Sequence, residues 1–495
     1  MEEKPRRDGQ DLMDVELQQP VPHQPSGTQS DASCELSTSS DQQHEDGKGR
    51  GTHLVDWEGD NDPENPMNWP DSKKWTNIIV LSSLSVVTPL GSSMFAPGIP
   101  SIMKEFRDSS TVTATFLLSI YILGFAVGPL FVAPLSEIYG RRHLYIYANI
   151  IFALFTIGAA LSNSVGMLLA FRLLMGLSGV VPLTIGSGTI ADMVSVEKRG
   201  RAVSLWAMGP LLGPCAGPAA GGFLIRAAGW RWVFWLIAIL SGILIPITFF
   251  CLRETYAPVL LDQRAHRFRE KTGDPHVRSV LGVQSTRSEK FRLAAVLRCT
   301  SPYPISYGIL YLLIATFTYV YTEEYGFDEG SSGLVFLPAG LGMVIGVLGF
   351  GQLVDLVVKR TKARGLQHRP EDRLNPIISI PCSLAMPIGL FIYGWTIQKG
   401  IHWIVPMLGV LVICIGLMGI MTCIQNYLID AFPKYAASVS AALAILRSLL
   451  GALLPLSCIG WGNSVLGFIA LGLVPIPVLL YVFGSRLRAK FQVRL

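Results

Sequence analysis

Two arginines lie inside long apolar stretches of the chain, where a charged side chain needs a partner. Arg172 falls in "FRLLMGLSG" and Arg447 in "AILRSLLG". A cation in hydrocarbon costs about 2.5–3.5 kcal/mol, so each is expected to face protein or a water-filled path. For Arg172 the alternative is a side chain that reaches the outer membrane surface. Arg447 lies nearer the middle of its stretch, which favours a cavity-facing or carbonyl-paired role.

A second charged pattern, "APLSEIYGRR", ends another apolar stretch. Glu137 is predicted to cap the N-terminus of a neighbouring helix, whose dipole favours an anion. Gly140 permits a tight turn. Arg141 and Arg142 are predicted to pair with carboxylates, and making and breaking those pairs would give a two-state latch. The simpler alternative is that both arginines only anchor the chain at the cytoplasmic surface.

The partners of this latch and its repeat can also be named. Asp192 and Glu197, on the adjacent cytoplasmic loop, are candidate partners for the arginines. Asp355 in "GQLVDLVVKR" is followed at +4 and +5 by Lys359 and Arg360, as Glu137 is followed by its two arginines. The two patterns stand at the same depth in the two halves of the chain, which indicates an internal repeat.

The stretch "GPCAGPAAGG" carries small residues at helical spacing within an uncharged run. Residues Gly213, Gly217 and Gly221 fall on one face, which lets another helix approach closely. Prolines 210, 214 and 218 each remove a helix hydrogen bond and favour bending. We expect a helix that pivots against a neighbour; an ordinary tight contact is the alternative. The stretch follows no strand, which excludes a phosphate-binding loop.

The rest of the chain predicts an all-α polytopic membrane protein. Of its 495 residues 50% are hydrophobic and 15% charged, and the mean hydropathy is +0.43. Apolar runs of about 20 residues, each long enough to cross a bilayer, recur along it. We predict twelve transmembrane spans near residues 76–96, 113–134, 144–163, 166–189, 202–225, 233–252, 303–322, 333–354, 376–396, 402–424, 437–459 and 464–484.

Charge predicts the orientation and the division into parts. With both termini in the cytoplasm, 26 Lys and Arg residues fall in inside connections and 5 in outside ones. The first 60 residues hold 14 acidic and 5 basic side chains and few apolar clusters, as in disordered segments. We expect a disordered acidic cytoplasmic tail (1–70), a six-helix bundle (71–252), a cytoplasmic loop (253–300), a second six-helix bundle (301–485) and a short cytoplasmic C-terminus (486–495).

These motifs resemble those of the major facilitator superfamily, in its fungal-type twelve-span drug:proton antiporter branch. The resemblance covers roughly residues 55–490 and rests on "DPENPMNWP", "APLSEIYGRR", "FRLLMGLSG", "GPCAGPAAGG", "WRWVFW", "ETYAPVLL" and "NYLIDAFPKYAAS". It implies two six-helix bundles that open alternately to each side, and it links Arg172 to proton coupling. It also identifies an antiporter motif, composed of Gly213, Gly217, Pro218, Gly221 and Gly222.

One departure from the branch concerns proton coupling. No Asp, Glu or His is placed centrally in any predicted span, and Ala315 stands where many relatives carry a glutamate. Proton antiport is therefore implied by the resemblance alone. The candidate residues of a central substrate cavity are polar or aromatic; they are Tyr121, Tyr311, Gln425, Asn426 and Tyr427.

We therefore expect a plasma-membrane exporter of amphipathic or apolar organic compounds, such as drugs, toxins or fungal secondary metabolites. Its partners would be a small-molecule substrate, protons and the lipid bilayer, and it would act as a monomer. We expect no cofactor, no metal and no nucleic acid, and not an enzyme, because the sequence shows no metal-ligand cluster or nucleophile–base pair. The alternatives are an importer of a polyamine, vitamin or other nutrient, and a non-transporting membrane sensor.

Overall fold

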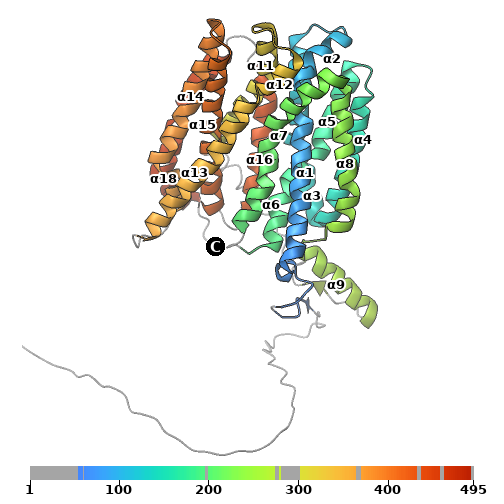
Figure 1. Cartoon of the computed structure of the whole chain (residues 1–495). Coiled ribbons are helices and arrows are strands. Elements are labelled where there is room, and N and C mark those ends of the chain that lie inside the picture. Colours follow the sequence, from blue (N-terminus) through green and yellow to red (C-terminus); the bar gives the residue numbers. More distant parts are fainter. Residues whose placement is uncertain are drawn as a thin grey trace, which may run out of the picture. The chain divides into compact units, whose positions relative to one another are not determined.

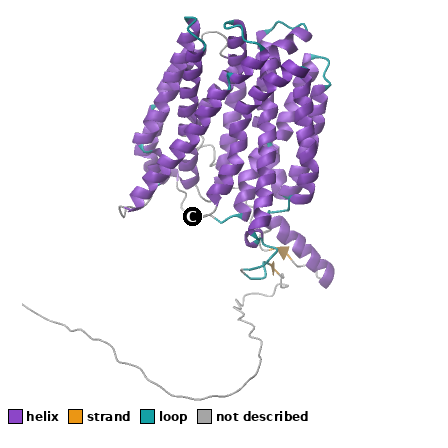
Figure 2. Ribbon diagram, viewed as in Figure 1, coloured by secondary structure: helices purple, strands orange, loops and turns teal. Residues whose placement is uncertain are grey.

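The computed structural model describes residues 54–59, 61–195, 199–273, 278–279, 302–363, 369–431, 436–457 and 462–491. Within them the chain is almost entirely helical, as Figure 2 shows. The predicted tail up to residue 53, the latch candidate Glu197, most of the cytoplasmic loop and residues 492–495 lie outside the described residues.

The first half forms the six predicted spans. Its helices are α1 (Asp71–Ser93), α2 (Ile99–Glu105), α3 (Thr111–Tyr139), α4 (Arg141–Ala160), α5 (Val165–Gly179), α6 (Val181–Met193), α7 (Arg199–Ala228) and α8 (Arg231–Cys251). The predicted fourth span is split into α5 and α6 at Val180. Pro182 has no N–H to donate to a carbonyl of α5, so it cannot continue that helix. It fits the first turn of α6, where a backbone N–H has no partner within the helix.

The second half follows the same plan. Its helices are α11 (Pro302–Glu323), α12 (Glu329–Leu334), α13 (Leu337–Ala363), α14 (Pro376–Gln398), α15 (Ile404–Ala431), α16 (Ala436–Ser457), α17 (Gly462–Leu473) and α18 (Pro475–Phe491). Each of the twelve predicted spans coincides with one helix or two consecutive helices. Eight of the spans in the described residues are long and apolar enough to cross a membrane by length and composition.

Helix α9 (Ala257–Thr272) projects from one end of the helical bundle, while α2 lies at the other (Figure 1). We call these the α9 end and the α2 end. The first residues of α1, α4 and α9 and the last residues of α3 and α8 meet at the α9 end. The loop predicted at 253–300 therefore contains a helix of 16 residues.

The prediction that residues 1–70 are a disordered tail is wrong for its last part. A short strand β1 (Leu54–Val55) pairs in parallel with β2 (Arg278–Ser279), and a 3₁₀ turn follows at Pro66–Asn68. Asp62 is only 3% exposed. Composition alone indicated disorder because the groups that order this segment lie some 200 residues later, on α9.

The closest packing in the first half lies between α1 and α7. A Cβ atom added at Gly209 or Gly213 would run into Ser85 or Pro89 of α1, and one at Gly217 would lie 3.0 Å from the Ser93 hydroxyl. A Cβ atom at Gly221 would run into Met94, which follows α1 directly. Gly209, Gly213 and Gly217 thus meet residues of α1 that recur at the same spacing of four, and Gly221 meets the residue just after that helix.

Hydrogen bonds accompany this packing. The Ser85 hydroxyl donates to the Trp206 carbonyl at 2.9 Å, and the Ser93 hydroxyl donates to the Gly213 carbonyl at 3.2 Å. Gly222, the last residue of the motif, is also buried. The predicted close helix contact is therefore present, and its partner is α1.

Replacing Gly221 by alanine is expected to destabilise the protein by about 1–3 kcal/mol, because the new methyl group would collide with the carbonyl of Met94, just after α1. Thermal unfolding of the purified protein in detergent would show a lower midpoint temperature. Gly242 of α8 is the matched control, since an added Cβ there meets nothing within 4 Å. Equal midpoints for Gly221→Ala and Gly242→Ala would contradict the packing described.

Candidate functional site

Arg172 of α5 is fully buried and is bound by backbone carbonyls. Its Nε donates to the Leu117 carbonyl at 2.6 Å, and its two Nη atoms donate to the Gly91 and Ser92 carbonyls at 3.3 and 3.1 Å. Helix α1 ends at Ser93, so these last two carbonyls belong to its final turn, where intrahelical partners are missing. The guanidinium therefore caps the C-terminus of α1 and complements its dipole.

Two aromatic rings cover the same guanidinium. Its Cζ lies 3.7 Å from the ring centroid of Phe95 and 5.1 Å from that of Tyr121. Such contacts favour a cation, more so when water is excluded. The alternative that Arg172 extends to the membrane surface is excluded by its 0% exposure.

Arg447 of α16 lies over an aromatic ring. Its Cζ is 4.9 Å from the ring centroid of Tyr307, on α11, and its side chain is half-buried. Tyr307 in turn packs on Tyr311, with ring centroids 5.1 Å apart. Arg447 therefore joins α16 to α11 within the second half.

The α4 N-terminus is capped by a residue that the sequence prediction missed. The Glu254 carboxylate accepts hydrogen bonds from the backbone N–H groups of Arg141 and Arg142, both at 3.0 Å. Sequence analysis assigned a capping role to Glu137, but Glu137 is exposed, and the cap at α4 comes from Glu254 in "ETYAPVLL". The only sequence signal was an acidic residue following an apolar span.

Gly140 is required at this turn for two reasons. Its φ of 84° is rarely adopted by other residues, and an added Cβ would lie 2.5 Å from a Glu254 carboxylate oxygen. The turn between α3 and α4 and the approach of Glu254 therefore depend on the same glycine.

The arginine side chains of the motif extend to three further elements. Arg141 Nε lies 2.8 Å from Asp192 Oδ2 at the end of α6, and the guanidinium lies over Tyr256, 5.2 Å from its ring centroid. Arg142 donates to the Phe249 carbonyl of α8 at 2.9 Å. The pairing of Arg141 with Asp192 thus joins elements of the first half. The side chain of Asp355 lies outside the described residues.

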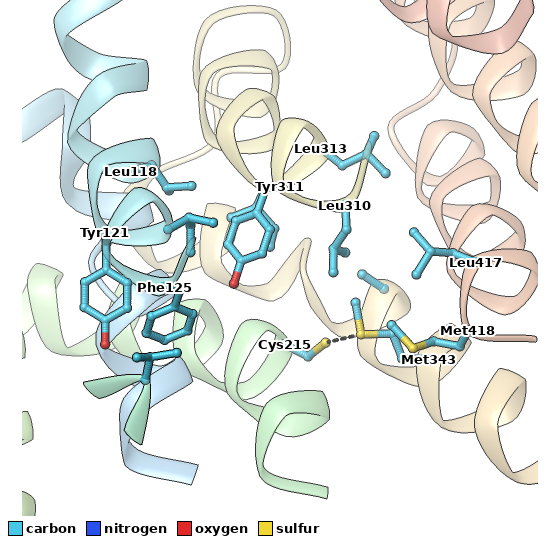
Figure 3. Close-up of a cluster of buried hydrophobic side chains, with 14 of the residues drawn as sticks. Leu118, Tyr121, Phe125, Cys215, Leu310, Tyr311, Leu313, Met343, Leu417 and Met418 are labelled. Atoms are coloured by element: carbon cyan, nitrogen blue, oxygen red, sulfur yellow. Dashed lines mark hydrogen bonds between the residues drawn. The ribbon is translucent and has the colours of Figure 1, made fainter. Parts of the chain in front are cut away.

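Helix α7 contacts the second half through the face opposite its glycines. The backbone of Gly333 on α12 closely approaches the Pro218 carbonyl, and Cys215 Sγ lies 3.6 Å from Met343 Sδ on α13 (Figure 3). At the α2 end, Arg226 Nη1 lies 2.8 Å from Asp328 Oδ2, just before α12. The antiporter-motif helix is therefore packed between α1 and the second half.

A small apolar pocket, with room for about one water-sized molecule, lies beside this contact. Its lining comes from α7, α11, α13 and α15 and from the turn before α13; it includes Pro214, Cys215, Leu313, Phe317, Met343 and Cys414. None of these residues was predicted to face a cavity. The sequence cannot distinguish an apolar residue that lines a pocket from one that packs against a neighbouring helix. The pocket lining offers no charged group.

The candidate cavity residues are placed differently from one another. Tyr121 is fully buried, and its hydroxyl donates to the Thr88 carbonyl at 2.8 Å. Tyr311 and Tyr427 are also buried, Asn426 is half-buried and Gln425 is exposed. Tyr121 and Tyr311 therefore present almost no surface to a cavity in this structure, since their rings pack among neighbouring side chains.

Removing the Glu254 carboxylate is expected to cost about 0.5–2 kcal/mol, as lost N-caps do, because two N–H groups of α4 lose their acceptor. Glu254→Ala should therefore lower the unfolding midpoint of the purified protein. Glu137→Ala, at an exposed position, serves as the matched control and should leave the midpoint unchanged. The reverse order would show that Glu137 supplies the cap.

Replacing Arg172 is expected to be severe, because each carbonyl left buried without a donor costs about 1–3 kcal/mol. Arg172→Met should lower the unfolding midpoint most. Arg172→Lys should lower it less, since a single ammonium cannot span all three carbonyls. Arg226→Met, at an exposed arginine, is the control and is expected to change stability by about 1 kcal/mol or less. Wild-type stability in Arg172→Met would contradict the capping role.

Comparison with known proteins agrees with this architecture. The profile of the Major Facilitator Superfamily matches residues 81–455. The chain is 44% identical to "Efflux pump radE" of Floropilus chiversii over 90% of this chain and 87% of that protein. It is 42% identical to "MFS-type transporter penM" of Penicillium rubens over 89% of this chain and 91% of that protein.

Solved structures share the fold at low sequence identity. A crystal structure of a D-xylose-proton symporter matches 85% of this chain and 99% of its own, with a TM-score of 0.60 and 16% identity. A bacterial homologue of the human lysosomal transporter Spinster matches with a TM-score of 0.55, 14% identity, and coverage of 86% and 100%. With its profile match and its fungal relatives spanning most of its length, the chain belongs to the Major Facilitator Superfamily and is a multi-pass membrane protein.

Proposed function

We propose that this protein exports amphipathic or apolar organic compounds, such as drugs, toxins or fungal secondary metabolites, by proton antiport through alternating access. The observation that carries the proposal is the position of α7 between α1 and the second half. A proline-containing helix with a close contact on each face can stay packed on one neighbour while it pivots against the other. The fungal relatives named as an efflux pump and as transporters support the direction of transport.

The proposed movement follows from the division into halves. We take residues 71–252 and 301–485 as the two bundles and the α9 end as the cytoplasmic side of the plasma membrane, with both termini there. The contacts of α7 with Asp328 and Gly333 lie toward the α2 end, which supports a conformation closed to the outside. Opening outward would break the Arg226–Asp328 ion pair and separate α7 from α12, by rigid-body movement of the halves. The protein is proposed to act as a monomer.

The substrate class is proposed from the apolar side chains beside α7, which would line a wider space when the two halves separate. Cys215, Phe317 and Met343 contribute to the pocket lining, which contains no carboxylate that would neutralise a polyamine. Polarizable thioether and aromatic groups adapt to ligands of varied shape. This chemistry favours export of uncharged apolar compounds over import of a polyamine.

Proton coupling is proposed from the likeness to the drug:proton antiporters. Arg172 and Arg447 are the charges placed deep in the predicted spans, and both are held by partners that favour a cation. At the cytoplasmic end, the Arg141–Asp192 pair is the proposed latch, whose making and breaking would accompany the exchange between states.

The proposal predicts that cells expressing the protein retain less of an uncharged lipophilic fluorescent dye than cells lacking it, and that a protonophore removes the difference. Gly333→Ala should reduce export by about fivefold or more, because a methyl group at the Pro218 carbonyl obstructs closure at the α2 end. Gly349→Ala on α13 is the control, since an added Cβ there meets nothing within 4 Å. Greater accumulation in expressing cells would favour an importer; equal accumulation in all conditions would contradict transport of this class.

A further inference from the structure

The segment that precedes α1 packs against α9, far from the pocket beside α7. We call residues 54–59 and 61–70 the α1 flank; it contains the "DPENPMNWP" motif, to which the proposed transport cycle gives no role. Strand pairing joins Leu54 and Val55 to Arg278 and Ser279, beyond the end of α9. The flank therefore contacts a part of the chain about 200 residues away.

The centre of this contact is an arginine in an acidic socket. Arg264 of α9 is 9% exposed, and its Nη1 lies 2.5 Å from Asp62 Oδ2, while its Nη2 is bound by Glu58. Glu64 Oε2 lies 3.9 Å from the same guanidinium. Removing one member of such a buried pair leaves the other charge uncompensated, so both members are needed to hold the contact.

Asp62 also organises the flank itself. Its carboxylate accepts hydrogen bonds from the backbone N–H groups of Glu58 and Glu64, both at 2.8 Å. The N–H of Glu58, followed by the Arg264 guanidinium, holds the pKa of Asp62 below its ordinary value against the opposing effect of burial. One carboxylate thus folds the flank and binds it to α9.

Glu254, which caps α4, lies just before the first residue of α9. Asn77 Oδ1, near the start of α1, accepts a hydrogen bond from the backbone N–H of Arg253 at 3.0 Å. The next residue, Glu254, caps the N-terminus of α4 and also accepts from the N–H groups just before α9. Helix α9 is thus held by Arg264 in its middle and by Glu254 and Asn77 at its beginning.

We propose that the α1 flank and α9 form a strap, locked by the Asp62–Arg264 pair, that holds Glu254 on α4 and makes α1 and α4 move as one body. Asp62 and Arg264 are then positioning residues for transport, and this role rests on the proposed function. Alternating access requires each half to rotate as a unit. Loosening the strap would slow the conversion between the two transport states. It would leave the pocket unchanged, because no strap residue lines it.

The strap is tested on the full-length purified protein by hydrogen–deuterium exchange of backbone amides. Asp62→Asn and Arg264→Met should each speed exchange in residues 54–70 and also at Arg141 and Arg142, whose N–H groups Glu254 binds. Asp262→Asn, at an exposed carboxylate of α9, is the matched control and should change neither region. If exchange becomes faster only in residues 54–70, the positioning role is overturned. That is the result expected when the Asp62–Arg264 contact stabilises nothing beyond the α1 flank.

Transport by the same variants gives an independent measurement. In proteoliposomes with an imposed pH gradient and an uncharged lipophilic dye, both variants should lower Vmax by about fivefold with KM unchanged, in the range of coupling between distant sites. The double variant should be no slower than either single one, because both remove the same contact. Arg264→Lys, which keeps the charge, should restore part of Vmax and replaces Arg264→Met if that variant does not fold.

The two measurements separate the strap from the proposed function. A wild-type protein that moves no dye contradicts the proposed export, while the exchange data still decide whether Asp62 and Arg264 position Glu254. Unchanged Vmax in variants whose exchange rises at Arg141 and Arg142 would overturn the role of the strap in transport.

Discussion

The close packing of α7 on α1 is the contact on which the rest of the structure depends. Because four glycines of α7 carry no side chain, α1 lies against the backbone of α7, and serine hydroxyls on α1 bind α7 carbonyls. Pro214, Cys215 and Pro218 of α7 then lie toward the second half. The same helix can then serve as the internal support of the first half and as part of the surface on which the second half moves.

Charged side chains at helix ends complete this arrangement. Arg172 satisfies the carbonyls at the C-terminus of α1, and Glu254 satisfies the N–H groups at the N-terminus of α4. Asp328 caps α12 and pairs with Arg226 of α7. In each case a helix terminus is bound by a residue from another element or its preceding turn, as backbone groups without water require. In the described residues these charges therefore mark where helices begin and end.

Much of the fold could be predicted because bilayer-length apolar runs are local features. All twelve predicted spans are helical in their described residues, and most of their ends agree to within about four residues; the largest difference is at α13, which ends at Ala363 rather than at 354. The break at Val180 and the separation of α12 from α13 were not predicted, since hydropathy does not register a bend. At the candidate site, the arginine motif and the glycine stripe were found from spacing. Glu254 was missed as a cap because its partners, Arg141 and Arg142, are more than 100 residues away.

The sequence by itself determined the membrane character, the positions of the long apolar helices and the small-residue face of α7. These depend on composition and period within a single helix. Only the tertiary structure decided which helix fills the glycine face, which carbonyls surround Arg172, and that the acidic segment around Asp62 folds onto Arg264 of α9. Those contacts form between residues that are far apart in the chain and that packing brings within hydrogen-bonding distance. The local composition around each residue does not indicate which distant residue it will contact.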